Sequence, residues 1–461
     1  MQAATARRLA ARFLADYGMV FALVALCAYF SYATLDEQFP TGREAAHEVS
    51  QTAARRLGRE ATVVIAAHTG EQAAAFAQAA REGLERRGIE VLATVAGGPP
   101  QLGRELDRMA AEGPVPEAIV ATCQVARWPL LQDVAQRWPA LAGVQVVAPR
   151  STWWPDFLKR SNLVAIADRI VVIAILAIGM TMVIITAGID LSVGSLIALS
   201  AVLSMVLVRD VAGAAEASGA GMVLCCLAGV AACGAVGLFS GAMVAFFSIP
   251  PFIVTLAMMQ VARGLAFILA RGQSVYRVPA SIDWLGRGSG PLGIPNTVTL
   301  MVVLYAAAHV VMARTVLGRY IYAVGGNAEA ARLSGVPVRR VVLFVYAMSG
   351  LLAGLGGVVQ ASQLRTGDPK YGTTYELYVI AAVVVGGTSL AGGQGKIFGT
   401  LIGAFIIAVI QNGMNLTRVE NYTQMVVLGF VILGAVLLDM LKGRGGRLRA
   451  LLRRRRAPPP Q

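Results

Sequence analysis

The chain has 461 residues, of which 56% are hydrophobic and 14% are charged, and it contains 50 glycines. This composition is typical of a polytopic membrane protein and excludes a soluble globular protein. The formal net charge is +14. The excess lysines and arginines lie beside hydrophobic segments, whereas residues 36–160 contain nearly equal numbers of acidic and basic residues. We therefore attribute the charge to membrane orientation and anionic lipids, and not to nucleic acid binding.

The first predicted element is a transmembrane helix. Residues 17–35 are an uncharged run of about the length that crosses a hydrocarbon core. Arg7, Arg8 and Arg12 precede this run, which predicts a cytoplasmic N-terminus. No A-x-A cleavage pattern closes it, so we expect residues 1–35 to be a retained cytoplasmic start and first membrane helix, and not a removed signal peptide.

Residues 36–160 predict a domain outside the bilayer. Short apolar runs at 62–67, 89–95, 118–122 and 144–148 predict strands, and amphipathic stretches at 71–87, 101–112 and 125–138 predict helices between them. Strands that alternate with helices favour an α/β domain with a parallel sheet. Because this domain follows the first span, we expect it on the extracytoplasmic side.

Two segments of this domain resemble the N-terminal lobe of periplasmic sugar-binding proteins. They are Glu82-Gly83 followed by Arg87-Gly88-Ile89-Glu90-Val91, and Glu112-Gly113 followed by Glu117-Ala118-Ile119-Val120. The resemblance covers one lobe, whereas such proteins hold sugar between two. We therefore expect the His68-Thr69-Gly70 turn to be structural or vestigial and not a working sugar site.

Nine more apolar segments predict further membrane helices, at residues 170–186, 191–208, 219–249, 252–270, 297–313, 341–364, 377–391, 397–414 and 422–438. With the first span they make about ten, and an even number places both termini in the cytoplasm. Three glycine pairs spaced by four residues predict close helix packing, at 237 and 241, 350 and 354, and 399 and 403. Arg263 needs a cavity, a partner or an interface, and we favour an interface.

A conspicuous motif follows the second span, Thr186-Ala187-Gly188-Ile189-Asp190-Leu191-Ser192-Val193-Gly194-Ser195. Its polar and glycine residues interrupt the helix at membrane depth. Such irregular backbone is tolerated where it is buried in protein or lines a polar cavity. An ordinary turn between two spans is the alternative interpretation.

Residues 314–340 form a long polar break that carries five arginines and one glutamate, which predicts a cytoplasmic loop. Asn327 is the predicted N-cap of a short helix, Glu329 lies in its first turn, Arg332 lies near its end, Gly335 suits the C′ position and Pro337 stops it. On spacing alone, an ordinary capped surface helix between two spans is the favoured interpretation of these residues.

Four segments resemble, in order, the permeases of ribose-type ABC importers. They are GIDLSVGS at 188–195, the GGN…AA…SG pattern at 325–335, GGTSL at 386–390 and QNGMNL at 411–416. The resemblance covers residues 164–441 and the first span. The family has a short loop where this chain has residues 36–160.

The resemblance implies a polytopic α-helical fold and a function. It implies the permease subunit of an ABC importer for a monosaccharide or similar small polar solute, in the bacterial plasma membrane. Its domains would be 1–35, 36–160, a permease domain at 161–441 and a basic cytoplasmic tail at 442–461. The chain would be no enzyme and would hold no cofactor, because a partner ATPase subunit binds ATP.

The resemblance also implies partners and sites. The partners are the ATPase subunit, an extracytoplasmic solute-binding protein and a second copy or related permease. The expected ATPase-coupling residues are Gly325, Gly326, Asn327, Ala330, Ala331, Ser334 and Gly335. We take five polar residues as candidates for the translocation pathway, namely Thr186, Asp190, Ser192, Asn412 and Asn415.

Two other classes remain open, a membrane-anchored solute sensor and an ion-coupled carrier. The many spans argue against a sensor. Only Glu376 and Asp439 are acidic residues near span ends, which leaves little material for a proton relay. The histidines and cysteines show no metal-ligand or catalytic spacing, and Lys396 is followed by Ile397, so the nearby glycines are no P-loop.

Overall fold

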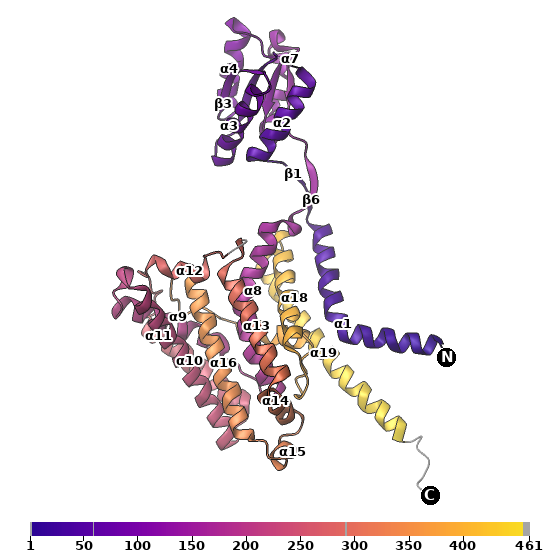
Figure 1. The fold of residues 1–461 in the computed structure, drawn as a ribbon, viewed down its shortest axis with the longest axis vertical. Coiled ribbons are helices and arrows are strands. Elements are labelled where there is room, and N and C mark those ends of the chain that lie inside the picture. Colours follow the sequence, from indigo (N-terminus) through magenta and orange to yellow (C-terminus); the bar gives the residue numbers. More distant parts are fainter. Residues whose placement is uncertain (1, 59, 291–292, 455–461) are drawn as a thin grey trace. The chain divides into compact units, whose positions relative to one another are not determined.

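The structure, a computed structural model, describes the backbone of residues 2–58, 60–290 and 293–454 (Figure 1). Its internal contacts divide the chain into two units, one formed by Met1–Thr34 and Asp156–Gln461 and the other by Leu35–Pro155. The side chains of Arg7, Arg8 and Arg12, of Asp439 and of the predicted basic tail lie outside the described residues. We refer to the two units as the helical unit and the lobe.

The lobe contains a four-stranded parallel sheet in the order β3-β2-β4-β5. The strands are β2 (Thr62–Ala67), β3 (Glu90–Ala96), β4 (Ala118–Ala121) and β5 (Gln145–Val147). Alternate residues of the strands face opposite sides of the sheet. Val63 and Ile65 pack with α2 (Gly42–Leu57) and α3 (Glu71–Glu85), whereas Ala66 packs with α4 (Pro99–Glu112) and the segment after β4. Helices therefore cover both faces.

Parts of the lobe differ from expectation. The helix predicted at 125–138 is replaced by α5 (Cys123–Ala126), α6 (Pro129–Gln132) and α7 (Val134–Arg137). Pro129 lacks an N–H and disfavours helical backbone at Trp128, which is extended with ψ 137°. A two-stranded antiparallel ribbon of β1 (Leu35–Gln38) and β6 (Thr152–Pro155) was also not predicted. It exposes Trp153 and Trp154, while Phe157 beyond it is buried in the helical unit.

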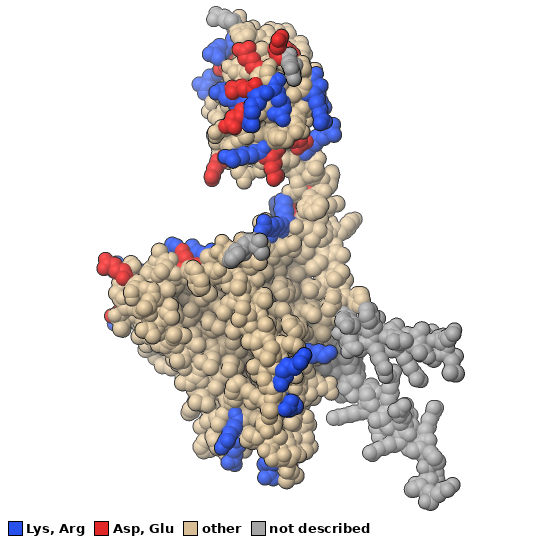
Figure 2. Space-filling model, in the orientation of Figure 1, with Lys and Arg blue, Asp and Glu red and all other residues tan. Residues whose placement is uncertain are grey.

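The helical unit holds seven helices that are long and apolar enough to cross a membrane, among the described residues. They are α8 (Arg160–Ile185), α9 (Val193–Asp210), α10 (Gly219–Phe247), α11 (Pro251–Leu269), α13 (Asn296–Arg314), α16 (Val338–Leu364) and α18 (Ile397–Leu416). Three shorter apolar helical segments are Gly18–Ala33 in α1 (Gln2–Ala33), α17 (Tyr375–Val385) and Asn421–Leu437 in α19 (Asn421–Arg454). Figure 2 shows the visible face of this unit with little charge between its ends.

Helix α8 lies at the centre of the helical unit, and its residues from Ile170 to Ile185 are all buried. Helices α10 and α16 pack side by side through the predicted glycines. A Cβ atom on Gly237 would collide with the carbonyl oxygen of Tyr346, and one on Gly350 would collide with that of Cys233. A Cβ atom on Gly403 would likewise collide with the carbonyl oxygen of Ala382. The prediction of close packing at these glycines is confirmed.

Candidate functional site

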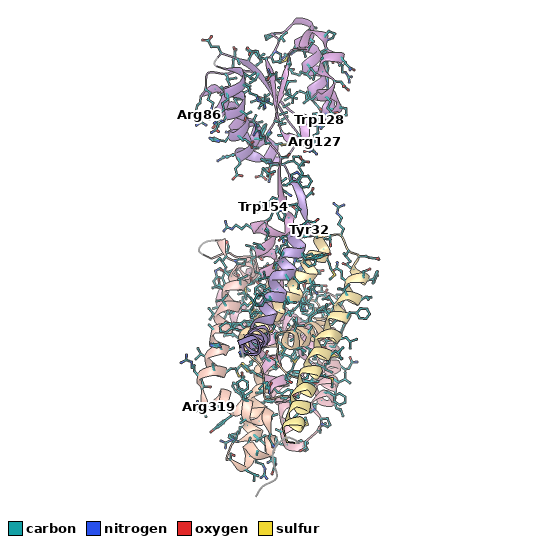
Figure 3. All side chains as sticks on the ribbon, turned by 90° about the vertical axis from the view of Figure 1, so that its right-hand side faces the viewer. Tyr32, Arg86, Arg127, Trp128, Trp154 and Arg319 are labelled. Carbon is teal, nitrogen blue, oxygen red and sulfur yellow. The ribbon has the colours of Figure 1, made fainter. Side chains whose placement is uncertain are left out.

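The short helix α15 (Ala328–Leu333) lies between α14 (Val316–Gly326) and α16, at the end of the helical unit opposite Tyr32, where Figure 3 also places Arg319. The Oδ1 atom of Asn327 accepts the backbone N–H of Ala330 at 2.9 Å, which confirms the predicted N-cap. Most of the helix surface is exposed, and Ala331 is its buried residue. Leu333 is 75% exposed, so α15 presents an apolar side chain outward.

The end of α15 follows the predicted pattern. Gly335 has a φ of 85°, which suits glycine. Its N–H donates to the carbonyl of Arg332, and the N–H of Val336 donates to the carbonyl of Ala331, so the two bonds form a Schellman motif. Hydrogen bonds from Arg332 to Glu329, together with its charge, hold the pKa of that carboxyl below its usual range.

Gly325 connects α15 to the interior. A Cβ atom on Gly325 would collide with the carbonyl oxygen of Ile185, the last residue of α8. The N–H of Gly393 donates to the same Ile185 carbonyl at 2.8 Å, and the hydroxyl of Tyr322 donates to the carbonyl of Gly395 at 2.8 Å. Three sequence motifs far apart in the chain therefore meet here. We call residues 185–187, 325–326 and 392–395 the loop junction.

The turn after α8 is buried and internally hydrogen-bonded. Asp190 is 1% exposed. Its Oδ1 atom accepts the backbone N–H and the hydroxyl of Ser192 at 3.0 and 2.6 Å, and its Oδ2 atom accepts the hydroxyl of Ser349 on α16 at 2.7 Å. The hydroxyl of Thr186 donates to the carbonyl of Val183 in its own helix. Asp190 thus ties the turn between α8 and α9 to α16.

A second irregular segment, residues 365–374, meets the start of α9. A Cβ atom on Gly194 would collide with the carbonyl oxygen of Gly372 and the carboxylate of Glu376. The guanidinium of Arg263 on α11 donates to the carbonyls of Pro369 and Tyr371 at 2.8 and 2.7 Å. The structure therefore gives Arg263 a protein partner, where the sequence favoured an interface.

The two asparagines predicted for the pathway line a cavity of about 240 Å³ between α8, α18 and α19. Asn412 donates to the side-chain oxygen of Asn162 at 3.0 Å, and Asn415 accepts from Gln424 at 2.8 Å. The other lining residues are Ile166, Arg169, Ile170, Ala408, Gln411, Asn421 and Gln424. This wall offers amide donors and acceptors beside one cation, Arg169, so it can exchange hydrogen bonds with a polar solute.

The predicted pathway residues therefore fall in three places. Asn412 and Asn415 lie on the cavity wall, Asp190 and Ser192 lie in the protein interior, and Thr186 lies within the loop junction. Four other polar residues of the cavity wall are not among those predicted for the pathway, namely Arg169, Gln411, Asn421 and Gln424. A usable signal existed, because amide side chains are uncommon within apolar helices.

The chain is similar to known proteins over more than half of its length. Residues 162–436, which lie within the helical unit, match the family model described as the permease component of branched-chain amino acid transport systems. The chain is 44% identical over 310 residues to the ribose import permease protein of Escherichia coli K12, covering 66% of this chain and 92% of that protein.

Two further relatives are similar to a large part of the chain. The L-arabinose ABC transporter permease protein of Azospirillum brasilense is 36% identical over 329 residues, covering 71% of this chain and 94% of that protein. The D-allose transport system permease protein of Escherichia coli K12 is 37% identical over 286 residues, covering 62% and 85%. No solved structure matches the chain significantly.

Proposed function

Since the chain belongs to the family of ABC transport-system permease components, we propose that it is the membrane subunit of an importer for a monosaccharide or similar small polar solute. The relatives named for ribose, arabinose and allose support this solute class. As a permease subunit the chain is not itself an enzyme. Its partners are an ATPase subunit and a solute-binding protein, and the ATPase binds the ATP.

The proposed coupling mechanism rests on the backbone contacts at the loop junction. An exposed helix, α15, follows directly after Gly325, which touches the end of α8 and the segment 392–395. Backbone contacts of this kind leave no compressible side chain between the parts. When the ATPase binds ATP and displaces α15, the displacement passes through Gly325 to the buried turn and to α18, which begins at Ile397.

The proposal includes the orientation of the chain in the membrane and its assembly with a second permease. The ten apolar helical segments would all cross or enter the membrane, with both termini and α15 in the cytoplasm and the lobe outside. The arginines around α15 support this orientation. A second copy or a related permease would complete the translocation path, and lipids would cover the remaining apolar surface. Gly325, Gly326, Asn327, Ala330, Ala331, Ser334 and Gly335 would form the ATPase contact.

The amide-lined cavity is the proposed stretch of the pathway in this subunit. Asn412 and Asn415 present groups that can exchange hydrogen bonds with hydroxyls. Asp190, Ser192 and Thr186 would act one step away, by holding the turn that links this region to α16 and the loop junction.

Vesicle uptake tests the proposal. The purified chain is reconstituted with its ATPase and binding-protein partners, and uptake of radiolabelled D-ribose, L-arabinose and D-allose is measured with and without ATP. We expect ATP-dependent accumulation of at least one sugar, and none when the ATPase is omitted. Accumulation by this chain without the ATPase would contradict the proposal.

A further inference from the structure

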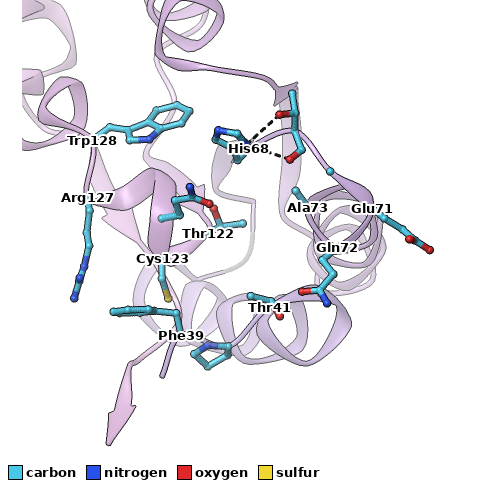
Figure 4. Close-up of a pocket in the computed structure, with 15 residues that line it drawn as sticks. Phe39, Thr41, His68, Glu71, Gln72, Ala73, Thr122, Cys123, Arg127 and Trp128 are labelled. Carbon is cyan, nitrogen blue, oxygen red and sulfur yellow. Dashed lines mark hydrogen bonds between the residues drawn. The ribbon is translucent and has the colours of Figure 1, made fainter. Parts of the chain in front are cut away.

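The lobe contains a cavity that the permease function does not use. It has a volume of about 710 Å³, within the range of small-molecule sites. Its walls are residues 39–42, 68–73 and 122–124 together with Arg127 and Trp128 (Figure 4). The segments 68–73 and 122–124 directly follow β2 and β4, so the cavity opens at the carboxyl ends of two neighbouring parallel strands.

The strand order explains why a cavity forms here. From β2 the chain passes through α3 to β3 on one side, and from β3 it passes through α4 to β4 on the other side of β2. Helices α3 and α4 pack against opposite faces of the sheet. The connections therefore diverge between β2 and β4, and ligands of open parallel sheets bind where the strand order reverses in this way.

Aromatic rings stand on two sides of the cavity. Figure 4 shows Trp128 above, beside His68, and Phe39 below. The rings of His68 and Trp128 meet edge to face, with centroids 6.1 Å apart. The Nδ1 atom of His68 lies 3.1 Å, within hydrogen-bond distance, from both the carbonyl oxygen and the hydroxyl of Thr69, and this contact fixes the orientation of the imidazole. Flat apolar faces of this kind pack well on the C–H face of a sugar ring.

The charges at the cavity are already neutralised or directed away. The guanidinium of Arg127 lies over the Phe39 ring, 4.2 Å from its centroid, and pairs with Glu37 at 2.8 Å. Hydrogen bonds from Ser151 and Arg127 hold the pKa of Glu37 below its usual range, so this pair is ionised at neutral pH. Glu71 points away from the cavity in Figure 4. Among the described residues that line this cavity, none presents an unpaired lysine or arginine to a phosphate or carboxylate.

The remaining polar groups are neutral. Cys123 is buried, donates to the carbonyl of Pro149, and has a pKa raised by burial, so it stays a thiol. The side chains of Thr41, Gln72 and Gln124 line the cavity and have no hydrogen-bond partner within the described part of the chain. Hydroxyl and amide groups donate and accept equally, as solute hydroxyls require.

We propose that this cavity binds a neutral polyhydroxylated solute of monosaccharide size. The sequence favoured a structural or vestigial turn at His68, and the proposal departs from that expectation. Because the cavity is open on one side, the affinity is weak, and a bound solute stays accessible from that side. The choice of sugars as ligands rests on the proposed function, but binding here needs neither the ATPase nor translocation.

The test is equilibrium binding to the purified full-length chain in lipid nanodiscs, without ATPase or binding protein. Saturation-transfer NMR is recorded with D-ribose, L-arabinose and D-allose, and with ribose 5-phosphate as the anionic probe. We expect saturable binding of at least one neutral sugar. Trp128→Ala should weaken it about tenfold, as the loss of an aromatic contact does. The matched control Trp154→Ala removes an exposed tryptophan of β6 and should change nothing.

Two more variants keep the test decisive. Gln124 is exposed, so Gln124→Ala leaves the fold intact and should also weaken binding if Trp128→Ala fails to fold. Trp284→Ala, at an exposed tryptophan of the helical unit that lines neither cavity, should leave sugar binding unchanged. Absence of saturable sugar binding, binding insensitive to both lobe variants, or tighter binding of the phosphate ester would each overturn the proposal. Failed ATP-driven uptake would instead overturn the proposed function alone.

Discussion

Gly325 and Gly326 are neighbours in the sequence but have opposite surroundings. A Cβ atom on Gly325 would overlap backbone atoms of Ile185 and Gly393, whereas one on Gly326 would meet nothing within 4 Å. Neither residue has a positive φ. The requirement for glycine at 325 therefore comes from close approach of three backbone segments and not from the local turn. The sequence predicted both glycines as a pair and could not separate them.

This difference gives a matched pair of variants. Gly325→Ala should destabilise the loop junction by about 1–3 kcal/mol, since backbone atoms cannot yield as a flexible side chain can. We expect it to reduce solute-dependent ATP hydrolysis in the reconstituted complex much more than Gly326→Ala does, because the added Cβ atom of Gly326→Ala lies in open space. Equal rates in the two variants would refute the role of the loop junction.

Asp190 provides a second prediction at this scale. Asp190→Ala removes the acceptor for three donors of Ser192 and Ser349 and leaves them buried without partners. We expect a loss of about 3 kcal/mol in the free energy of unfolding, seen as a lower thermal midpoint in detergent. Ser349→Ala removes one of these donors and should have a smaller effect. An unchanged midpoint for Asp190→Ala would show that these bonds contribute no stability.

At the scale of elements, α17 differs most from its prediction. The sequence predicted a span at 377–391, but the helix ends at Val385 and has 11 residues. At about 1.5 Å per residue, this is roughly half the thickness of a hydrocarbon core. Gly386 and Gly387 end the helix, and Gly387 has a φ of 81°. The chain then passes to the loop junction instead of crossing further, and it turns back as α18.

The cap of α15 can be tested as an element. Asn327→Ala removes the acceptor for the Ala330 N–H and should destabilise the helix by about 1 kcal/mol. We expect faster amide hydrogen exchange across 328–336 and weaker coupling to ATP hydrolysis. Asn327→Asp keeps the acceptor and serves as the control, with exchange close to that of the wild type. Equal exchange in the Ala and Asp variants would contradict the capping role.

At the scale of the whole molecule, the lobe is joined to the helical unit by two connections that lie side by side. The N–H of Asp156 donates to the carbonyl of Thr34 at 2.9 Å, and the N–H of Phe157 donates to its hydroxyl at 3.1 Å. These bonds lie within the helical unit, and β1 and β6 pair from Leu35 and Pro155 outward. Residues 35–155 can therefore be replaced by a short turn without separating α1 from α8.

This geometry allows the lobe to be deleted without disturbing the helical unit. Replacement of residues 35–155 by a Gly-Ser linker should leave membrane insertion and uptake at saturating sugar intact. Uptake at low sugar concentration should fall several-fold, because the lobe would no longer hold the solute that we propose binds in its cavity. Initial uptake rates over a range of sugar concentrations measure the effect. Unchanged uptake at low concentration would remove any role of the lobe in transport.

The orientation of the molecule gives the last prediction. In a variant without the five native cysteines, Val115→Cys marks the lobe and Leu333→Cys marks α15, and both positions are well exposed. A membrane-impermeant maleimide should label position 115 in intact cells and position 333 only after the membrane is opened. Labelling of position 333 in intact cells would reverse the proposed topology.

Local sequence patterns were enough to predict many features of this fold. The structure has a strand at Thr62–Ala67, an N-cap at Asn327 and close helix packing at Gly237 and Gly350, as the sequence predicted. Strand alternation, capping and small-residue spacing each depend on residues a few positions apart, so the sequence determines them directly. The family resemblance has the same basis, because its motifs are contiguous, and the comparisons confirm it.

The tertiary structure decided what depends on distant segments. It brought residues near 185, 325 and 393 into one loop junction and gave Asp190 its partner on α16. It shortened α17, paired β1 with β6, and opened the lobe cavity between segments 68–73 and 122–124. Such features arise from close packing between parts of the chain that are far apart in sequence, and no periodicity within one segment records which partner it will meet.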